Sequence, residues 1–429
     1  MNNYIYKLHG IAQKESRIIL GLMSGTSLDG LDIALCKITG SGAQTQLAVL
    51  AFETMNYSSS FRNEIKAVFS KVDVNMKMLC AMNAKIGIAH AHLIKEALIK
   101  WNIKAEQIDI IASHGQTVYH APKSLKTVAN SNKLVIEHNG FTDSENSNMV
   151  RETNDSNEDY EYPNSTLQIG DGDHISVNTG IITVSDFRQK HVAAGGEGAP
   201  LVIYGDYLLF GHPTENRIML NIGGISNLTF LPSDHQVEGL FATDVGPGNT
   251  LMNQYMQYHY SKEYDKDGEI ARSGKVNEKL LKSLLEHPFF FQDFPKTTGP
   301  ELFNLPFLLE AQETSNTAMI DQADVMATLC LFTAKCIGTA VLSLKQKYPD
   351  LWVYVSGGGC NNPTLMENIR EELKDITIEN TSVLGMNPDA KEAVLFALLA
   401  NETLAGAPLS FPEVSGAPTV CFGKISFPS

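Results

Sequence analysis

The amino-acid sequence predicts an α/β protein made of two similar halves, on the basis of two observations. First, apolar segments of strand length alternate with longer segments of helical periodicity along the chain. Second, the strand–turn–strand order that opens the chain recurs in its second half. A chain of 429 residues is also too long for one ordinary core, so we expect two domains, 1–212 and 213–429.

The first half begins with a hairpin. An apolar strand at 18–22 is followed by a glycine-rich turn at 24–30 and by a second strand at 31–38. The glycines of this turn tolerate the positive φ angles that a tight hairpin requires. A third strand is expected at 46–54 and a short buried strand at 108–112. Between them, helical patterns cover 59–72 and 76–101.

The second half repeats this order. A strand at 218–222 runs into a turn of glycine, serine and asparagine at 223–227, and another strand covers 228–231. Later, a strand at 352–355 is followed by the glycines at 357–359. In the same way, the strand at 108–112 in the first half is followed by a polar turn at 113–117. The recurrence indicates an internal duplication, with coincidental similarity between two α/β domains as the alternative.

One segment, 124–165, departs from this pattern. It is rich in asparagine, serine and acidic residues, and it cannot bury enough apolar surface to offset the entropy lost on ordering. We therefore expect a polar, acidic surface insertion in the first domain, either mobile or carrying a small hairpin at 133–137. A functional lid is the alternative.

The composition excludes several classes of function. The net charge is −15 and no run of lysine and arginine occurs, so the chain lacks the basic surface that nucleic acids require. The apolar runs are shorter than a membrane span or a signal peptide core, which predicts a cytoplasmic protein without a membrane partner. The six cysteines show no zinc-site spacing. A pocket for an anionic substrate therefore needs its own local positive charge.

Three glycine-rich turns follow predicted strands, at 24–30, 244–249 and 356–359. Backbone N–H groups in such turns can converge on a phosphate, because no side chain blocks the approach. One such turn is equally explained as a tight hairpin, but three in a duplicated chain predict a nucleotide between the two domains. The residues expected to bind the nucleotide are Gly25, Thr26, Ser27, Leu28, Asp29, Gly30, Leu31, Asp32, Gly246, Gly248, Asn249, Gly357, Gly358 and Gly359.

The sequence contains neither the glycine–lysine loop of P-loop enzymes nor the glycine pattern of dinucleotide-binding domains. Without a P-loop lysine, the phosphate charge has to be offset by backbone dipoles, hydroxyl groups and Mg²⁺. Asp29 and Asp244 are expected to hold the metal directly or through water, with Asp32 as a further candidate. For Asp29 the alternative is a turn residue that caps its own backbone.

Asp186 is the candidate catalytic base. It follows a short strand at 181–184 and precedes a glycine-rich loop, a position at which α/β sheets present carboxylates to a crevice. The alternative is an aspartate that caps a helix. Arg188 lies two residues further on and can either pair with Asp186 or bind an anionic group of the substrate.

Three further polar side chains are expected to line the substrate pocket. His114 and Gln116 follow the strand at 108–112, and His174 follows the polar loop at 168–173. No metal role is expected for the histidines, and each is equally explained as a hydrogen-bonded structural residue.

Nine short motifs resemble one family, the anhydro-N-acetylmuramic acid kinases. The motifs occur in the family's order and span nearly the whole chain outside the acidic insertion. They are GLMSGTSLDG at 21–30, SHGQTV at 113–118, QIGDG at 168–172, SDFR at 185–188, AGGEGAPL at 194–201, NIGGISNLT at 221–229, GPGN at 246–249, GGG at 357–359 and EAVLFA at 392–397.

The resemblance implies an actin-like ATPase fold, in which duplicated ribonuclease-H-like domains flank a central cleft. It also implies a reaction of peptidoglycan recycling, in which 1,6-anhydro-N-acetylmuramic acid, ATP and water give N-acetylmuramic acid 6-phosphate and ADP. Asp186 then corresponds to the general base, Gly357–Gly359 face the adenosine, and Glu392 contacts the sugar. The implied cofactors are ATP and Mg²⁺, and the implied assembly is a homodimer.

Three residues depart from the pattern of the family. His191 and Asn253 stand where an aspartate is expected, and Glu197 stands where glutamine is usual. None of these changes removes Asp186 or a phosphate-binding turn, but they leave a shifted substrate preference or reduced activity open. Two alternatives therefore stand beside the leading interpretation: an actin-like kinase for another sugar or acid, and a non-catalytic sensor of muropeptides or nucleotides.

Overall fold

The computed structural model describes residues 3–25, 28–71, 73–121, 163–199, 201–408 and 418–429. The predicted acidic insertion at 124–165 lies outside the described residues except for its last three. Thr26 and Ser27 of the first glycine-rich turn also lie outside them.

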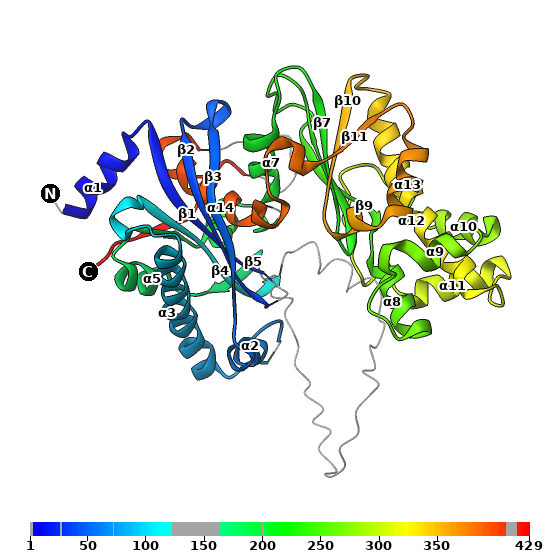
Figure 1. Ribbon diagram of the computed structural model, residues 1–429, viewed down its shortest axis with the longest axis horizontal. Coiled ribbons are helices and arrows are strands. Elements are labelled where there is room, and N and C mark those ends of the chain that lie inside the picture. The colour runs from blue at the N-terminus through cyan, green and yellow to red at the C-terminus, as the bar shows by residue number, and fades with distance from the viewer. Residues whose placement is uncertain (1–2, 26–27, 72, 122–162, 200, 409–417) are drawn as a thin grey trace, which may run out of the picture.

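Two β-sheets organise the chain (Figure 1). The first is seven-stranded, in the order β12-β6-β4-β1-β2-β3 with β5 paired to β4. The second is five-stranded, in the order β11-β10-β7-β8-β9. The strands of the first sheet are β1 (Ser16–Ser24), β2 (Gly30–Thr39), β3 (Gln46–Asn56), β4 (Ile110–Ala121), β5 (Ser165–Ile169), β6 (Thr183–Ser185) and β12 (Lys424–Ser426). Those of the second are β7 (Asn216–Ile222), β8 (Ile225–Leu231), β9 (Phe241–Pro247), β10 (Leu351–Ser356) and β11 (Thr377–Asn380).

The two sheets share one topology. In each, three consecutive strands form an antiparallel meander, β1-β2-β3 or β7-β8-β9. Two later strands, β4 and β6 or β10 and β11, then extend the sheet in parallel from the first strand of the meander. The shared order confirms the predicted duplication of a ribonuclease-H-like unit, the arrangement of actin-like ATPases.

Helices cover both faces of each sheet. The long helix α3 (Met76–Lys100) packs with α5 (Gly172–Thr179) on the first sheet, close to the predicted bounds. Helix α12 (Gln322–Lys345) lies in the core of the second half with α13 (Pro363–Glu372). The other α-helices are α1 (Asn3–Ala12), α2 (Ser59–Lys66), α6 (Phe187–Ala193), α7 (Val202–Phe210), α8 (Thr250–Tyr260), α9 (Glu269–Ser273), α10 (Glu278–Leu285), α11 (Leu305–Ser315) and α14 (Lys391–Ala405).

Among the described residues, α12 is the one helix that is long and apolar enough to cross a membrane. However, 78% of its most apolar window is buried inside the protein. Burial in the core of the second half therefore accounts for its apolar composition.

Helices α7 and α14 lie between the two sheets (Figure 1). One face of this layer meets the first sheet: an added Cβ at Gly21 of β1 would lie 1.9 Å from the carbonyl oxygen of Ala393. The other face meets Met219 and Leu231 of the second sheet, which belong to the same buried cluster as α14. The division of the chain at 212/213 stays a prediction, but α14 and β12, which follow the second sheet in sequence, pack with the first.

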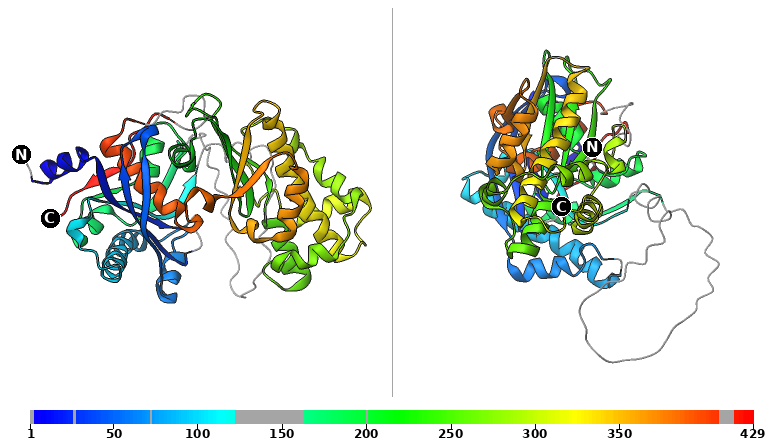
Figure 2. Two further views of the ribbon diagram at one scale, coloured as in Figure 1. Left: turned by 45° about the horizontal axis from the view of Figure 1, so that its top comes forward. Right: turned by 90° about the vertical axis from the view of Figure 1, so that its right-hand side faces the viewer.

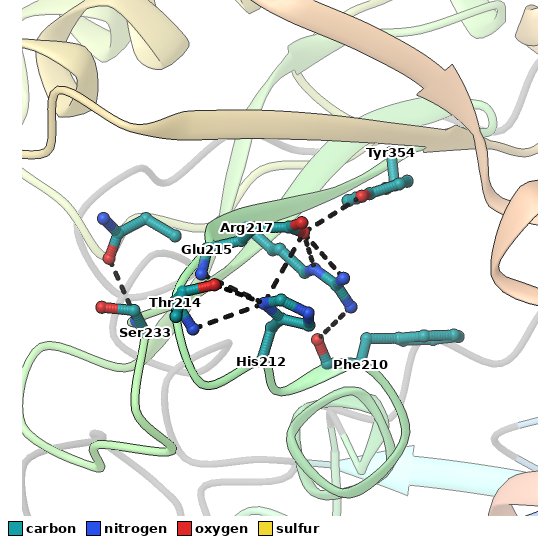
Figure 3. A network of polar contacts seen from close by, with 8 residues as sticks. Phe210, His212, Thr214, Glu215, Arg217, Ser233 and Tyr354 are labelled. Carbon is teal, nitrogen blue, oxygen red and sulfur yellow. Dashed lines mark hydrogen bonds and ion pairs between the residues drawn. The ribbon is translucent and has the colours of Figure 1, made fainter.

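The connection from α7 to β7 is held by a polar network (Figure 3). Arg217 donates from Nε to Glu215 Oε2 at 2.8 Å and from Nη1 to the carbonyl oxygen of Phe210 at 3.0 Å. Tyr354 of β10 donates to the same Glu215 oxygen at 3.3 Å, and the backbone N–H of Glu215 donates to His212 Nδ1 at 3.1 Å. These contacts fix the segment between α7 and β7 to the second sheet. The ribbon views of Figure 2 show the two sheets on either side of this connection.

Candidate active site

The predicted site residues of the first half gather at one edge of the first sheet. Strands β1, β4 and β6 run parallel, so the segments that follow them meet at the same edge. These segments are the turn that starts at Gly25 and the residue Asp186. His114 to Gln116 lie beside them, but inside β4 and not after it as predicted, and Gln116 pairs with Ser24 at the end of β1. The sheet topology therefore brings together residues that are far apart in the sequence.

A cavity of about 610 Å³ opens at this edge. Helix α3, strand β5, helix α6 and the start of β12 form its walls together with the interior of β4 and the end of β6. It contains Asp186 and His114, whereas the glycine-rich turns and Glu392 lie outside its lining. Its polar and charged lining residues are Asn83, Ser113, His114, Gln168, Asp171, Ser185, Asp186, Gln189, Lys190 and Lys424.

Asp186 has an unusual backbone conformation for a non-glycine residue. Its φ and ψ angles are 59° and 39°, in the left-handed region, and its position is the N-cap of α6. Its side chain makes no capping hydrogen bond, so the helix-cap alternative does not describe it. Instead, Oδ2 lies 2.6 Å from the ammonium of Lys424, and Ser185 Oγ donates to it at 3.4 Å. The carboxylate, 26% exposed, faces the cavity.

Arg188 does not pair with Asp186, which corrects one of the two roles expected for it. Its Nε donates to His114 Nε2 at 2.7 Å, and its Nη1 donates to the carbonyl oxygen of Gly198 at 2.9 Å. Since His114 accepts at Nε2, its proton lies on Nδ1 and is donated to the carbonyl oxygen of Gly115 at 2.9 Å. Burial and the neighbouring Arg188 charge lower the pKa of His114 well below its usual value, so the imidazole is neutral.

Gln116 supports the first glycine-rich turn rather than lining the cavity. Its Nε2 donates to the carbonyl oxygen of Gly25 at 3.3 Å, and its Oε1 accepts from Ser24 Oγ at 2.6 Å. Ser24 Oγ in turn lies 2.8 Å from the hydroxyl of Tyr57, which lies 2.8 Å from His90 Nε2. This buried chain connects α3 to the turn. Sequence reasoning missed Tyr57 and His90, because their environments are set by tertiary packing.

Glu392 lies in the first turn of α14, at the same end of the first sheet. Its side chain reaches solvent, but the surrounding walls desolvate the carboxylate and raise its pKa. The positive charge of Arg188 opposes this shift, and the negative charge of Asp32 adds to it. Glu392, Arg188 and Asp32 are thus electrostatic neighbours.

In the second half, the glycine-rich turns gather at the corresponding edge. The turn of Gly223 and Gly224 follows β7, the first strand of that meander, and it therefore corresponds to the turn that follows β1. Gly357 follows β10, which is parallel to β7, and an added Cβ there would lie 2.6 Å from Asn221 Oδ1. Our expected nucleotide ligands did not include Gly223 and Gly224, although the internal repeat was a signal for them.

The glycine-rich turn at 244–249 has a structural role that limits its contribution to phosphate binding. The backbone N–H groups of Gly248 and Asn249 donate to the carbonyl oxygens of Gly224 and Gly223, both at 2.8 Å. An added Cβ at Gly248 would lie 2.4 Å from the Gly223 oxygen. Two of the backbone donors expected at the nucleotide are therefore already used to join the two turns. Gly246 has φ +152° and packs closely against Cys336 of α12.

The predicted metal ligands lie on different sheets. Asp29 and Asp32 interact electrostatically, and burial followed by the charges of Asp29 and Asp389 raises the pKa of Asp32. Asp244 accepts from the backbone N–H of Thr298 at 2.8 Å, and burial raises its pKa to about 6. Among the described residues, no group of three or more His, Cys, Asp and Glu forms a ready metal site. Excess negative charge near Asp32 nevertheless suits a divalent cation.

The structure also shows the surroundings of His174 and of the three residues that depart from the family pattern. His174 lies on α5, its Cβ facing Gly87 of α3, and it does not line the cavity. His191 is buried, accepts from the backbone N–H of Gly198 at 3.0 Å, and lies 3.2 Å from the hydroxyl of Tyr204. The charge of Glu197 reaches His120. Asn253 is in α8, half-buried.

The duplicated fold and the strand-end carboxylate define a phosphotransferase of the actin-like ATPase class. The sequence profile described as anhydro-N-acetylmuramic acid kinase matches residues 17–142 and 156–428. The anhydro-N-acetylmuramic acid kinase of Pseudoalteromonas atlantica is 49% identical over 431 residues, covering 100% of both chains. That of Caldanaerobacter subterraneus is 38% identical, covering 98% of this chain and 99% of its own. The chain belongs to the anhydro-N-acetylmuramic acid kinase family.

Proposed function

We propose that this chain is an ATP-dependent kinase that opens 1,6-anhydro-N-acetylmuramic acid with water and phosphorylates O6, yielding N-acetylmuramic acid 6-phosphate and ADP. Membership of the family supports this function. The structural observation that supports it most directly is the carboxylate of Asp186, which faces a cavity at the strand ends instead of capping its helix. The product places the chain in peptidoglycan recycling.

The substrate explains why such a carboxylate is needed. The anhydro sugar has no free 6-hydroxyl, so its internal acetal has to open before a phosphoryl group can be accepted. Asp186 accepts a proton from water as the water oxygen bonds to C1 and the C1–O6 bond breaks. The released O6 then bonds to the γ-phosphorus of ATP, and the bond from that phosphorus to ADP breaks.

The other side chains of the site hold charge in place around this reaction. Neutral His114 accepts the hydrogen bond from Arg188 Nε and so fixes that side of the guanidinium. The positive charge of Arg188 acts on Glu392, the residue that we assign to the sugar. We assign the nucleotide to the glycine-rich turns, with Gly223 and Gly224 added to the predicted set. Mg²⁺, held by Asp29 and Asp32, would neutralise charge that develops on the phosphates.

Product analysis in ¹⁸O-labelled water tests the function. Purified protein, ATP and the anhydro sugar should give a 6-phosphate with one ¹⁸O atom in the C1 hydroxyl, because water attacks C1. A phosphorylated product without label would instead indicate direct transfer to a hydroxyl of another sugar or acid. Binding of both ligands without release of ADP would indicate the sensor. A cytoplasmic location and a homodimeric assembly remain predictions.

A further inference from the structure

A lysine of the last strand lies beside the proposed base. Strand β12 pairs antiparallel with β6, so that Lys424 lies opposite Ser185, the neighbour of Asp186. Gly423, with φ +74°, allows this approach, because an added Cβ would lie 2.6 Å from Val184 Cγ1 and 2.9 Å from the Ser185 oxygen. As a result, Lys424 Nζ lies 2.6 Å from Asp186 Oδ2 inside the cavity.

Positive charge is scarce where the sugar would bind. The lysines that line the cavity are Lys190 and Lys424, and its carboxylates are Asp171 and Asp186. Arg188 lies outside the lining, with Nε and Nη1 engaged by His114 and Gly198. Lys424 is therefore the cation in direct contact with the proposed base.

The chemistry of the proposed reaction requires such a cation. The substrate is a muramic acid, whose carboxylate is ionised at neutral pH, and the base that activates water is also an anion. Two carboxylates in one cavity repel each other unless a positive group lies between them. An ammonium carries three N–H donors, and the described contact with Asp186 requires one of them. The Lys424 side chain is 65% exposed, so its remaining donors are accessible to a ligand.

We propose that Lys424 binds the carboxylate of the sugar and bridges it to Asp186, which makes Lys424 the residue that selects acidic over neutral anhydro sugars. The inference rests on the proposed function and adds the orientation of the substrate: its carboxylate end lies toward β12. Because the ammonium contacts both anions, it also lets the charged substrate approach the charged base.

The test compares two sugars and two proteins. Wild-type enzyme and Lys424→Gln are assayed with anhydro-N-acetylmuramic acid and with its uncharged methyl ester. Loss of a charge-assisted hydrogen bond should lower kcat/KM for the acid about 10- to 100-fold, chiefly through KM. The value for the ester should fall by a smaller factor, because that sugar loses only the effect of Lys424 on the Asp186 carboxylate. Lys424→Arg, which retains the charge, should restore most of the preference for the acid.

Lys190→Gln is the matched control, because it removes the same charge from the same cavity. It should leave the ratio between acid and ester close to that of wild type. The proposal is overturned if Lys424→Gln lowers kcat/KM for the acid and for the ester by the same factor. It is also overturned if Lys190→Gln, and not Lys424→Gln, removes the preference for the acid. Melting temperatures of all variants show whether any loss arises from unfolding.

Titration calorimetry without ATP separates this inference from the proposed function. A preference for the acid that depends on Lys424, in a protein that makes no product, would support the inference and reject the kinase. Normal turnover with a preference that is independent of Lys424 would reject the inference alone. If neither sugar binds, both are rejected.

Discussion

At the scale of single residues, the cavity combines the partly exposed carboxylate of Asp186 with polar groups that hold one another. Asp186 could be predicted because a carboxylate directly after a parallel strand lies at the sheet edge whatever the details of packing. Its partner Lys424 could not, because the pairing of β12 with β6 depends on long-range folding and leaves no local pattern. The same holds for the contact of Arg188 with His114.

Replacement of the proposed base gives the first prediction. Asp186→Asn should lower turnover by roughly 10²–10⁴, because the amide cannot accept the proton of the attacking water. Affinity for ATP should change little, since no described residue of the glycine-rich turns lines the cavity that contains Asp186. Steady-state kinetics and nucleotide titration measure the two quantities. Turnover close to that of wild type would remove Asp186 from the mechanism.

His191 gives a prediction about pH. Burial and the Arg188 charge lower the pKa of His191 to about 4, whereas an unfolded histidine titrates near 6.5. Between these values the unfolded chain binds more protons, so the contribution of His191 to stability is present above about pH 6.5 and is lost as the pH falls. His191→Asn should therefore lose less stability than wild type between pH 6.5 and 4.5, by about 1.4 kcal/mol per pH unit.

Urea unfolding at the two pH values measures this difference. Burial also lowers the pKa of His90 to about 4, and it raises that of Asp244 to about 6, with an effect of opposite sign. Wild type and His191→Asn both contain His90 and Asp244, so the effects of these two groups cancel in the comparison. Parallel pH dependences would show that His191 is not titrated on unfolding. The contact of His191 with Gly198 also indicates that this departure from the family serves the glycine-rich loop.

At the scale of secondary-structure elements, the contact between β1 and α14 fixes the position of Glu392. Gly21 of β1 lies so close to α14 that an added Cβ would be 1.9 Å from the carbonyl oxygen of Ala393. Both partners are backbone, so neither can yield by rotating a side chain. The strand and helix bounds were largely predictable from hydrophobic periodicity, but this close approach was not, because it joins segments from opposite ends of the chain.

Gly21→Ala should therefore push α14 away from the sheet. We expect a loss of more than about 2 kcal/mol in the free energy of unfolding, together with lower activity as Glu392 moves. Gly10→Ala is the matched control: it lies in α1 with no atom within 4 Å of the added Cβ, and it should be neutral or stabilise by up to about 1 kcal/mol. Equal stabilities of the two variants would contradict the packing described for α14.

At the scale of the whole molecule, α7 and α14 join the two sheets, and a buried ion pair joins these helices. Lys391 Nζ lies 2.8 Å from Asp206 Oδ1, with the aspartate side chain 2% exposed. The internal repeat made the two sheets predictable, because each copy has its own pattern of strands and turns. It could not show that the last helix and strand return to the first sheet, because that return has no counterpart in the first repeat.

Asp206→Asn should lower the free energy of unfolding by about 3 kcal/mol, because the Lys391 charge is left buried without its partner. The double variant Asp206→Asn with Lys391→Met should recover part of this loss, since it removes the unpaired charge. Chemical denaturation of the wild type and both variants measures the effect. A double variant that is less stable than Asp206→Asn would show that the lysine does not depend on the aspartate.

The placement of β12 has a consequence for folding during synthesis on the ribosome. The first sheet begins with residues that are synthesised early, yet α14 covers it and β12 completes it only when residues 391–405 and 424–426 have emerged. Until then, Asp186 lacks the lysine that accompanies it and β6 presents an unpaired edge. The nascent chain therefore cannot assemble the full cavity until residues 424–426 have left the ribosome.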